Sequence, residues 1–141
     1  MALRDVIGNG LSSDGVSFSG KTDPQIFREI LQRGDVAVDE ATFSDLLSAY
    51  SEELERRLRP ESVTLLPGVR PLVEALHEEA YAHLALLTGN LQPMAYLKLE
   101  MVGLAEYFPF GAFGSDHEDR YQLPPIAQAR AEAHTGQRFS G

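Results

Sequence analysis

The sequence predicts an α/β fold in which a helical region, over about residues 1–64, precedes an α/β region over residues 67–141. Three observations predict it. Two amphipathic helical patterns fill the first half of the chain, an apolar run ending in Thr-Gly-Asn stands in the second half, and helical and strand patterns alternate after residue 67. Such alternation is typical of a parallel sheet covered by helices.

The first helical pattern is TDPQIFREILQRG, in which Ile26, Phe27, Ile30 and Leu31 form one apolar stripe. Asp23 is the expected N-cap, Pro24 the first helical residue, and Gly34 the residue that closes the helix. The second pattern, DEATFSDLLSAYSEELERRLRP, repeats the apolar spacing, and Pro60 ends the helix. Its EELE and RRLR stretches predict a solvated, charge-paired face rather than a nucleic-acid patch.

The second half begins at the Leu66-Pro67-Gly68 joint with a helical pattern, GVRPLVEALHEEAY. We expect a core strand over about residues 83–88, buried on both faces because the run LALL is apolar throughout. A helix to about Gly103, a shorter parallel strand over about 110–114 and a helix from about Leu123 to His134 should follow.

Composition excludes several kinds of protein. The chain has 141 residues, no cysteine and a formal net charge of -9, which exclude disulfides and thiolate metal sites and argue against a nucleic-acid partner. No apolar run approaches the ~20 residues that cross a bilayer. The start, MALRDVIGNG, lacks the regions of a signal peptide, so the sequence predicts a cytoplasmic protein with no membrane partner. The four histidines show no metal-ligand spacing.

The run LALLTGN changes from apolar to small and polar at one point, where Thr88, Gly89 and Asn90 follow the strand. Ligand sites in parallel sheets lie at the carboxyl ends of strands. The alternative is a plain strand end that leads into an Asn-capped helix with no ligand.

Four segments in order carry a family resemblance: LLPGVRPLVEAL, AHLALLTGN, GLAEYFPFGAFGSD and DRYQLPPIAQARAEA. Together they resemble the second half of a haloacid dehalogenase-like phosphatase, most closely the phosphoglycolate phosphatase-like branch. FSGKTDPQIFREIL resembles the helical cap of that branch. The resemblance runs from about Val16 and implies a Rossmann-like parallel core, incomplete in this sequence, with an α-helical cap.

The resemblance also implies site residues and a substrate class, small phosphorylated metabolites. Thr88 would be the hydroxyl donor of the family's second motif, with Gly89 and Asn90 shaping the turn that binds phosphate. Preorganised donors of this kind stabilise the charge of a phosphoryl group in transit. Gly89 would let the main chain approach closely, because it has no Cβ.

Two cations are further candidates under the resemblance. Arg120 in DRYQLPP would be the third-motif cation that neutralises phosphate, although Tyr121 stands where the family usually has Pro. Lys21 belongs to a cap loop that faces the active site in the resembled branch. For Arg120 the alternative is a surface pair with a nearby carboxylate, which contributes little to stability: Asp116, Glu118 or Asp119.

The sequence departs from the family at its first and fourth motifs. No DxDGT-type nucleophile segment is present, and the acidic pair that holds Mg²⁺ in the family is not found. Asp5 is superficially similar to the nucleophile, but no apolar strand precedes it and no second Asp follows two residues on. We expect a fragment or truncated form of a phosphatase, inactive as given. The alternatives are a degenerate domain that binds a phosphorylated ligand or a protein, and a purely structural cap protein.

The missing first motif also predicts an open edge on the core strand. An unpaired apolar edge recruits another chain or aggregates, so the sequence predicts self-association or marginal folding.

Overall fold

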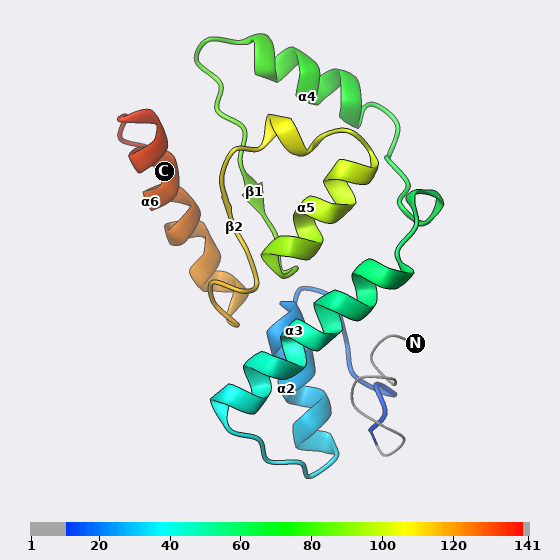
Figure 1. Cartoon of the computed structure of the whole chain (residues 1–141). Coiled ribbons are helices and arrows are strands. Elements are labelled where there is room, and N and C mark those ends of the chain that lie inside the picture. The colour runs from blue at the N-terminus through cyan, green and yellow to red at the C-terminus, as the bar shows by residue number, and fades with distance from the viewer. Residues whose placement is uncertain (1–10, 140–141) are drawn as a thin grey trace.

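The computed structural model describes residues 11–139. Figure 1 shows two crossing helices at one end and a small sheet with three further helices at the other. The helices and strands, in order, are α2 (Asp23–Arg33), α3 (Glu40–Arg57), α4 (Val69–Glu78), β1 (Leu86–Leu87), α5 (Gln92–Met101), β2 (Gly111–Ala112) and α6 (Leu123–Thr135), with short 3-10 turns η1 (Pro60–Ser62), η2 (Ala105–Tyr107) and η3 (Arg120–Gln122). The described helices include none that is long and apolar enough to span a membrane.

α2 begins one residue earlier than its capping pattern predicts. Thr22 is the N-cap, and its Oγ1 accepts a hydrogen bond from the N–H of Gln25 at 3.3 Å. The prediction that Asp23 caps the helix is therefore wrong: Asp23 is the first helical residue, and its carboxylate bonds elsewhere. Thr22 occupies the N-cap position because its fully buried hydroxyl also donates a hydrogen bond to the carbonyl of Glu118.

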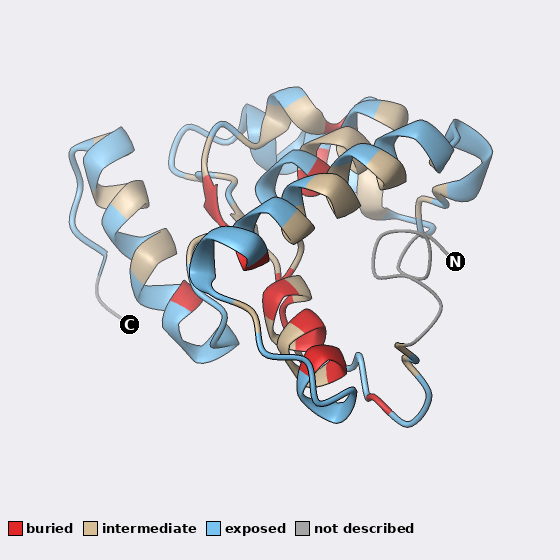
Figure 2. Cartoon of the chain, turned by 60° about the horizontal axis from the view of Figure 1, so that its bottom comes forward, coloured by how far each residue is buried: buried red, intermediate tan, exposed pale blue. Residues whose placement is uncertain are grey.

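The apolar stripe of α2 forms most of the helical core. Ile26, Phe27, Ile30 and Leu31 are all buried, which confirms the predicted stripe and appears as the buried band along α2 in Figure 2. Phe27 and Leu31 pack with Phe43 of α3, and the rings of Phe27 and Tyr50 meet edge to face at 4.8 Å. This packing holds α3 across α2.

The sheet consists of two short parallel strands. Leu86 pairs with Gly111 and Leu87 with Ala112, which confirms the predicted parallel pairing of the two segments. α6 packs against both strands. As predicted, this helix begins at Leu123. The guanidinium of Arg130 on α6 donates to the carbonyl of Gly111 at 2.7 Å and so fixes the helix to the strand.

β1 is shorter and more exposed than the sequence predicts. Its ladder covers Leu86–Leu87, with Leu84 and Leu86 half-buried and Leu87 51% exposed, so the prediction of a strand over 83–88 buried on both faces is wrong in extent and in burial. Leu86 N donates to the carbonyl of Phe110, just before β2, and Thr88 N donates to that of Ala112. β2 is the one strand paired with β1 in the described part of the chain. A single neighbour cannot cover both edges.

α4 also buries fewer of its apolar side chains than an amphipathic helix on a core would. Of its apolar face, Val73 is buried, but Leu72 is 59% exposed and Leu76 is 36% exposed. Among the aromatic residues between α5 and η3, Phe113 is buried, whereas Tyr107, Phe108 and Phe110 are half-buried. Apolar surface thus remains open on the α4 side of the molecule.

Two glycines let three segments meet at the end of the sheet. A Cβ on Gly114 would overlap the carbonyl oxygen of Gly89, and a Cβ on Gly89 would lie 2.6 Å from the carbonyl oxygen of Lys21. The chain before α2, the turn after β1 and the turn after β2 are therefore in backbone contact.

We expect Gly114→Ala to lower the free energy of unfolding by about 2–3 kcal/mol, because the new methyl group meets backbone rather than a movable side chain. Gly136→Ala is the matched control. Gly136 has open space around it and φ of 70°, so its cost of about 1 kcal/mol is conformational strain alone. Urea unfolding of both variants measures the difference, and equal losses would contradict the close packing at Gly114.

Candidate functional site

The turn after β1 is held by its own hydrogen bonds. Thr88 N donates to the carbonyl of Ala112 at 3.0 Å, and Asn90 N donates to Thr88 Oγ1 at 3.2 Å. Gly114 N donates to the carbonyl of Asn90 at 2.8 Å. These contacts fix the half-buried Thr88 side chain at the carboxyl end of β1, where the sequence analysis expects a ligand.

Asp23 at the start of α2 bonds the same turn through both backbone and side chain. Its N–H donates to the carbonyl of Gly89 at 2.8 Å. Its carboxylate accepts from Leu91 N at 3.0 Å and from Asn90 Nδ2 at 3.3 Å. The amide oxygen of Asn90 in turn accepts from Lys98 Nζ at 3.1 Å. The first residue of α2 is thus built into the turn that follows β1.

Burial raises the pKa of Asp23 above its ordinary value of 3.8. The hydrogen bonds from Leu91 and Asn90, and the charge of Lys98, oppose this shift in the pKa without cancelling it. The carboxylate is a costly charge that these donors partly stabilise.

A pocket of 260 Å³ opens beside this turn. Its polar walls are Lys21, Asp23, Tyr50 and Asn90, and its apolar walls are Phe18, Ile26 and Phe27. A larger groove of 630 Å³ runs between α3 and the turn after β2. We assign the site to the smaller pocket, because Asn90 lies in its wall whereas the larger groove contains none of residues 88–90.

Lys21 lies in the wall of this pocket, but its charge is already paired. Its Nζ lies 2.6 Å from Glu29 Oε2, and both side chains are mostly buried. The ion pair neutralises the one cation that the described residues place in the wall of the pocket.

Arg120 is exposed at the start of η3 and has no ion pair within residues 11–139. The alternative that it pairs with a neighbouring carboxylate is wrong. Asp116 accepts two hydrogen bonds from Arg130, at 2.6 and 2.7 Å, and Asp119 Oδ1 accepts from Tyr121 N. Arg130 holds the pKa of Asp116 below its ordinary value. The structure does not bring Arg120 into contact with Thr88.

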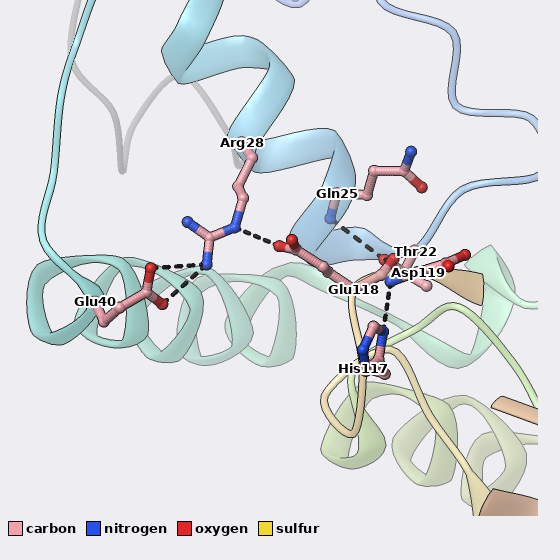
Figure 3. A network of polar contacts seen from close by, with 7 residues as sticks. All are labelled: Thr22, Gln25, Arg28, Glu40, His117, Glu118 and Asp119. Atoms are coloured by element: carbon pink, nitrogen blue, oxygen red, sulfur yellow. Dashed lines mark hydrogen bonds and ion pairs between the residues drawn. The ribbon is translucent and has the colours of Figure 1, made fainter. Parts of the chain in front are cut away.

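Glu118 is paired with Arg28 of α2, a residue that the sequence analysis did not single out. Figure 3 shows the guanidinium of Arg28 between Glu118 and Glu40, with Nη2 donating to the two oxygens of Glu40 at 3.1 and 2.9 Å. Both carboxylates raise the pKa of Arg28. Its guanidinium also lies 4.0 Å from the ring centre of Phe43, so one side chain links α2, α3 and the turn after β2.

Sequence reasoning missed Arg28 and Lys98 and assigned Asp23 to helix capping instead of to the turn after β1. Their partners are distant in sequence: Asp23 meets Leu91, Arg28 meets Glu118, and Lys98 meets Asn90. For Asp23 the one available signal is the Thr-Asp-Pro order, in which either of the first two residues can cap the helix.

The described residues around Thr88 do not fit a Mg²⁺ ion. Within residues 11–139 there is no group of three or more carboxylate or histidine side chains placed to hold a metal. Asp23 is the one carboxylate in the pocket wall, and it bonds Asn90 and Leu91. Asp5 lies outside the described residues.

Comparison with known proteins identifies a family. The family model described as haloacid dehalogenase-like hydrolase matches residues 1–136. No match was found among curated proteins.

We expect Asp23→Asn to lower the free energy of unfolding by about 1–2 kcal/mol. The NH2 group of the amide replaces one carboxylate oxygen, cannot accept from Asn90 Nδ2 and places a donor against that donor. Asp45→Asn, on the exposed side of α3, is the matched control and should change little.

The loss of unfolding free energy in Asp23→Asn should depend on pH. A raised pKa means that ionisation of Asp23 costs more in the folded than in the unfolded state, so wild type loses this stability as pH rises above 3.8. The variant has no such titration. The difference between them should be larger below pH 3.8 than near neutrality, and urea unfolding that shows the opposite trend would contradict the role of burial.

Proposed function

The chain belongs to the haloacid dehalogenase-like hydrolase family, and we propose that it binds small phosphomonoesters at the Thr88–Asn90 turn, in the manner of the phosphoglycolate phosphatase-like branch. One observation carries the proposal. The hydroxyl, glycine and amide stand together at the carboxyl end of β1, and Asp23 fixes their turn from the start of α2. Preorganised donors at such a position suit an anion.

The role proposed for Thr88 follows from its hydrogen bond. Its Oγ1 already accepts from Asn90 N, so the hydroxyl proton is free to donate to a phosphate oxygen. Gly89 is buried and tightly packed, and we propose that its N–H is the second donor. Asn90 is assigned to the organic side of the ligand, because it lines the pocket.

Arg120 is proposed as the cation that neutralises the phosphate. The support is its lack of an ion pair in the described chain, which leaves the guanidinium available, together with its place next to Glu118 and Asp119 in the turn that contacts Thr22. Recruitment of Arg120 would require a movement of η3, since the side chain is exposed in this structure.

We also propose that residues 1–64 form the cap and residues 67–141 the partial core, joined at Leu66-Pro67-Gly68. Gly68 supports the joint, because its φ of 85° turns the chain sharply before α4.

Binding without turnover is the proposed state of this polypeptide, as a fragment or truncated form of a phosphatase. An aspartyl-phosphate needs a nucleophilic carboxylate, and in the family a Mg²⁺ ion supplies charge stabilisation when bound. The sequence has no DxDGT-type segment, and the residues described around Thr88 supply neither group. A non-catalytic domain that binds a phosphorylated ligand or protein is the second candidate.

A partner surface is proposed at the outer edge of β1. Because Leu86 and Thr88 bond β2, the backbone groups of Leu87 point to the opposite edge, beside its exposed side chain. We propose that a second copy of the chain pairs there. Sedimentation should show association that rises with concentration; a monomer at all concentrations would refute it.

We expect inorganic phosphate to bind in the millimolar range, about 4 kcal/mol, and to shift the backbone NMR signals of residues 88–90. Thr88→Val keeps the shape of the side chain but removes the donor, so affinity should fall about threefold to tenfold. Thr64→Val, at an exposed position, is the matched control. Shifts confined to other residues would count against the proposal.

We expect the 141-residue chain to show no Mg²⁺-dependent hydrolysis of p-nitrophenyl phosphate or phosphoglycolate. A colorimetric phosphate assay measures this, with Asp5→Asn as the decisive variant. Turnover that is lost in Asp5→Asn would identify Asp5 as the nucleophile and overturn the non-catalytic state.

A further inference from the structure

Three of the four histidines line one pocket at the end of the sheet opposite to Thr88. His77 lies on α4, His83 lies in the chain before β1, and His134 lies on α6. The segments that precede the two parallel strands contribute to the wall, so the pocket lies at the amino ends of the strands, on the α4 side of the sheet in Figure 1. Its volume of 370 Å³ falls within the range of about 300–1,000 Å³ for small-molecule sites.

Aromatic rings stand at angles to one another in the wall of this pocket. The rings of His77 and Tyr107 lie 5.0 Å apart at 88°, so they form two adjoining walls at a right angle. The rings of Phe110 and His134 lie 4.8 Å apart at 41°. Rings at such angles can surround one compact group, as in the aromatic cages that hold quaternary ammonium ligands.

The charge of the wall favours the same kind of ligand. Glu106 of η2 is the one carboxylate in the wall, and no lysine or arginine lines it among the described residues. The Glu106 side chain is exposed and has no hydrogen bond or ion pair within residues 11–139. Its charge is therefore available to a cation and repels an anion, and the formal net charge of -9 acts in the same direction.

The three imidazoles contribute ring surface rather than a metal site. Among the described residues, no group of three or more histidine or carboxylate side chains is placed to hold a metal ion. Each imidazole instead meets an aromatic ring, and these rings belong to Tyr107, Phe139 and Phe110. In the neutral form, an imidazole adds aromatic surface to the pocket without repelling a cation.

We propose that this pocket binds a small organic cation, a quaternary or tertiary ammonium group, through the rings of Tyr107 and Phe110 and the carboxylate of Glu106. The site is separate from the turn after β1, because it lies at the other end of the strands. It does not depend on the phosphate binding proposed at that turn, so the failure of either proposal leaves the other standing.

Three probes of similar shape and different charge test this on the full chain by NMR titration: choline, its neutral carbon analogue 3,3-dimethylbutanol and the anion 3,3-dimethylbutanoate. The titration is run at about pH 8.5, where histidine side chains ordinarily carry no charge. Choline should bind about threefold to tenfold more tightly than the neutral analogue, and the anion should bind most weakly. The shifted signals should include Glu106, Tyr107 and Phe110 and leave residues 88–90 unchanged.

Two variants, each with a matched control, test the carboxylate and the ring. Glu106→Gln removes the charge, so the preference for choline over the neutral analogue should fall about twofold to fivefold. Glu55→Gln removes one charge at an exposed position of α3 and should leave this preference unchanged. Tyr107→Leu removes a ring from the wall and should also weaken the preference. Tyr81→Leu, at a residue that is 82% exposed, should leave it unchanged.

The titrations have outcomes that would overturn the proposal. Equal affinities for choline and its neutral analogue would do so, as would tighter binding of the anion. Choline-induced shifts that avoid residues 106–110 would place the cation elsewhere. Because Glu106 is exposed, its replacement by Gln should leave the fold intact, and an undiminished preference for choline in that variant would also contradict the assigned site.

Discussion

The contact between the start of α2 and the turn after β1 is the constraint on which the rest of the structure depends. Asp23 bonds Gly89, Asn90 and Leu91, and the absent side chains of Gly89 and Gly114 let the three backbones meet. Fully buried Thr22 adds a bond to Glu118 in the turn after β2. Because every one of these contacts joins segments far apart in sequence, the helical pair and the sheet become one body at this point.

Charge placement around this contact bears on the anion site proposed at Thr88. The formal net charge of -9 repels phosphate at long range, so the proposed binding must rely on local donors. Three nearby carboxylates are paired with arginines: Glu118 and Glu40 share Arg28, and Asp116 bonds Arg130. Asp23 keeps its charge, which Leu91 N partly stabilises. Thr88 therefore faces few uncompensated negative charges.

The same contact couples α2 to the site mechanically. Since Asp23 is the first residue of the helix and also part of the turn's hydrogen-bond network, a displacement of α2 must move or break the bonds to Asn90 and Leu91. Arg28, one turn further along, resists such a displacement through its bonds to Glu40 and Glu118 (Figure 3). The pocket between Tyr50 and Asn90 would change shape with any motion of the helical pair.

Local pattern determined what depends on neighbours along the chain. The buried stripe of α2, the cap at Gly34, the parallel pairing of β1 with β2, the start of α6 and the family itself were all predictable from the sequence. Tertiary structure decided the rest. Thr22 and not Asp23 caps α2, because Thr22 bonds both Gln25 and Glu118. β1 is half-exposed because one strand and one helix cover it in the described part of the chain. The charge of Lys21 is paired with Glu29. In each case the partner of a residue depends on which groups the fold brings within hydrogen-bond distance, and local sequence does not determine that.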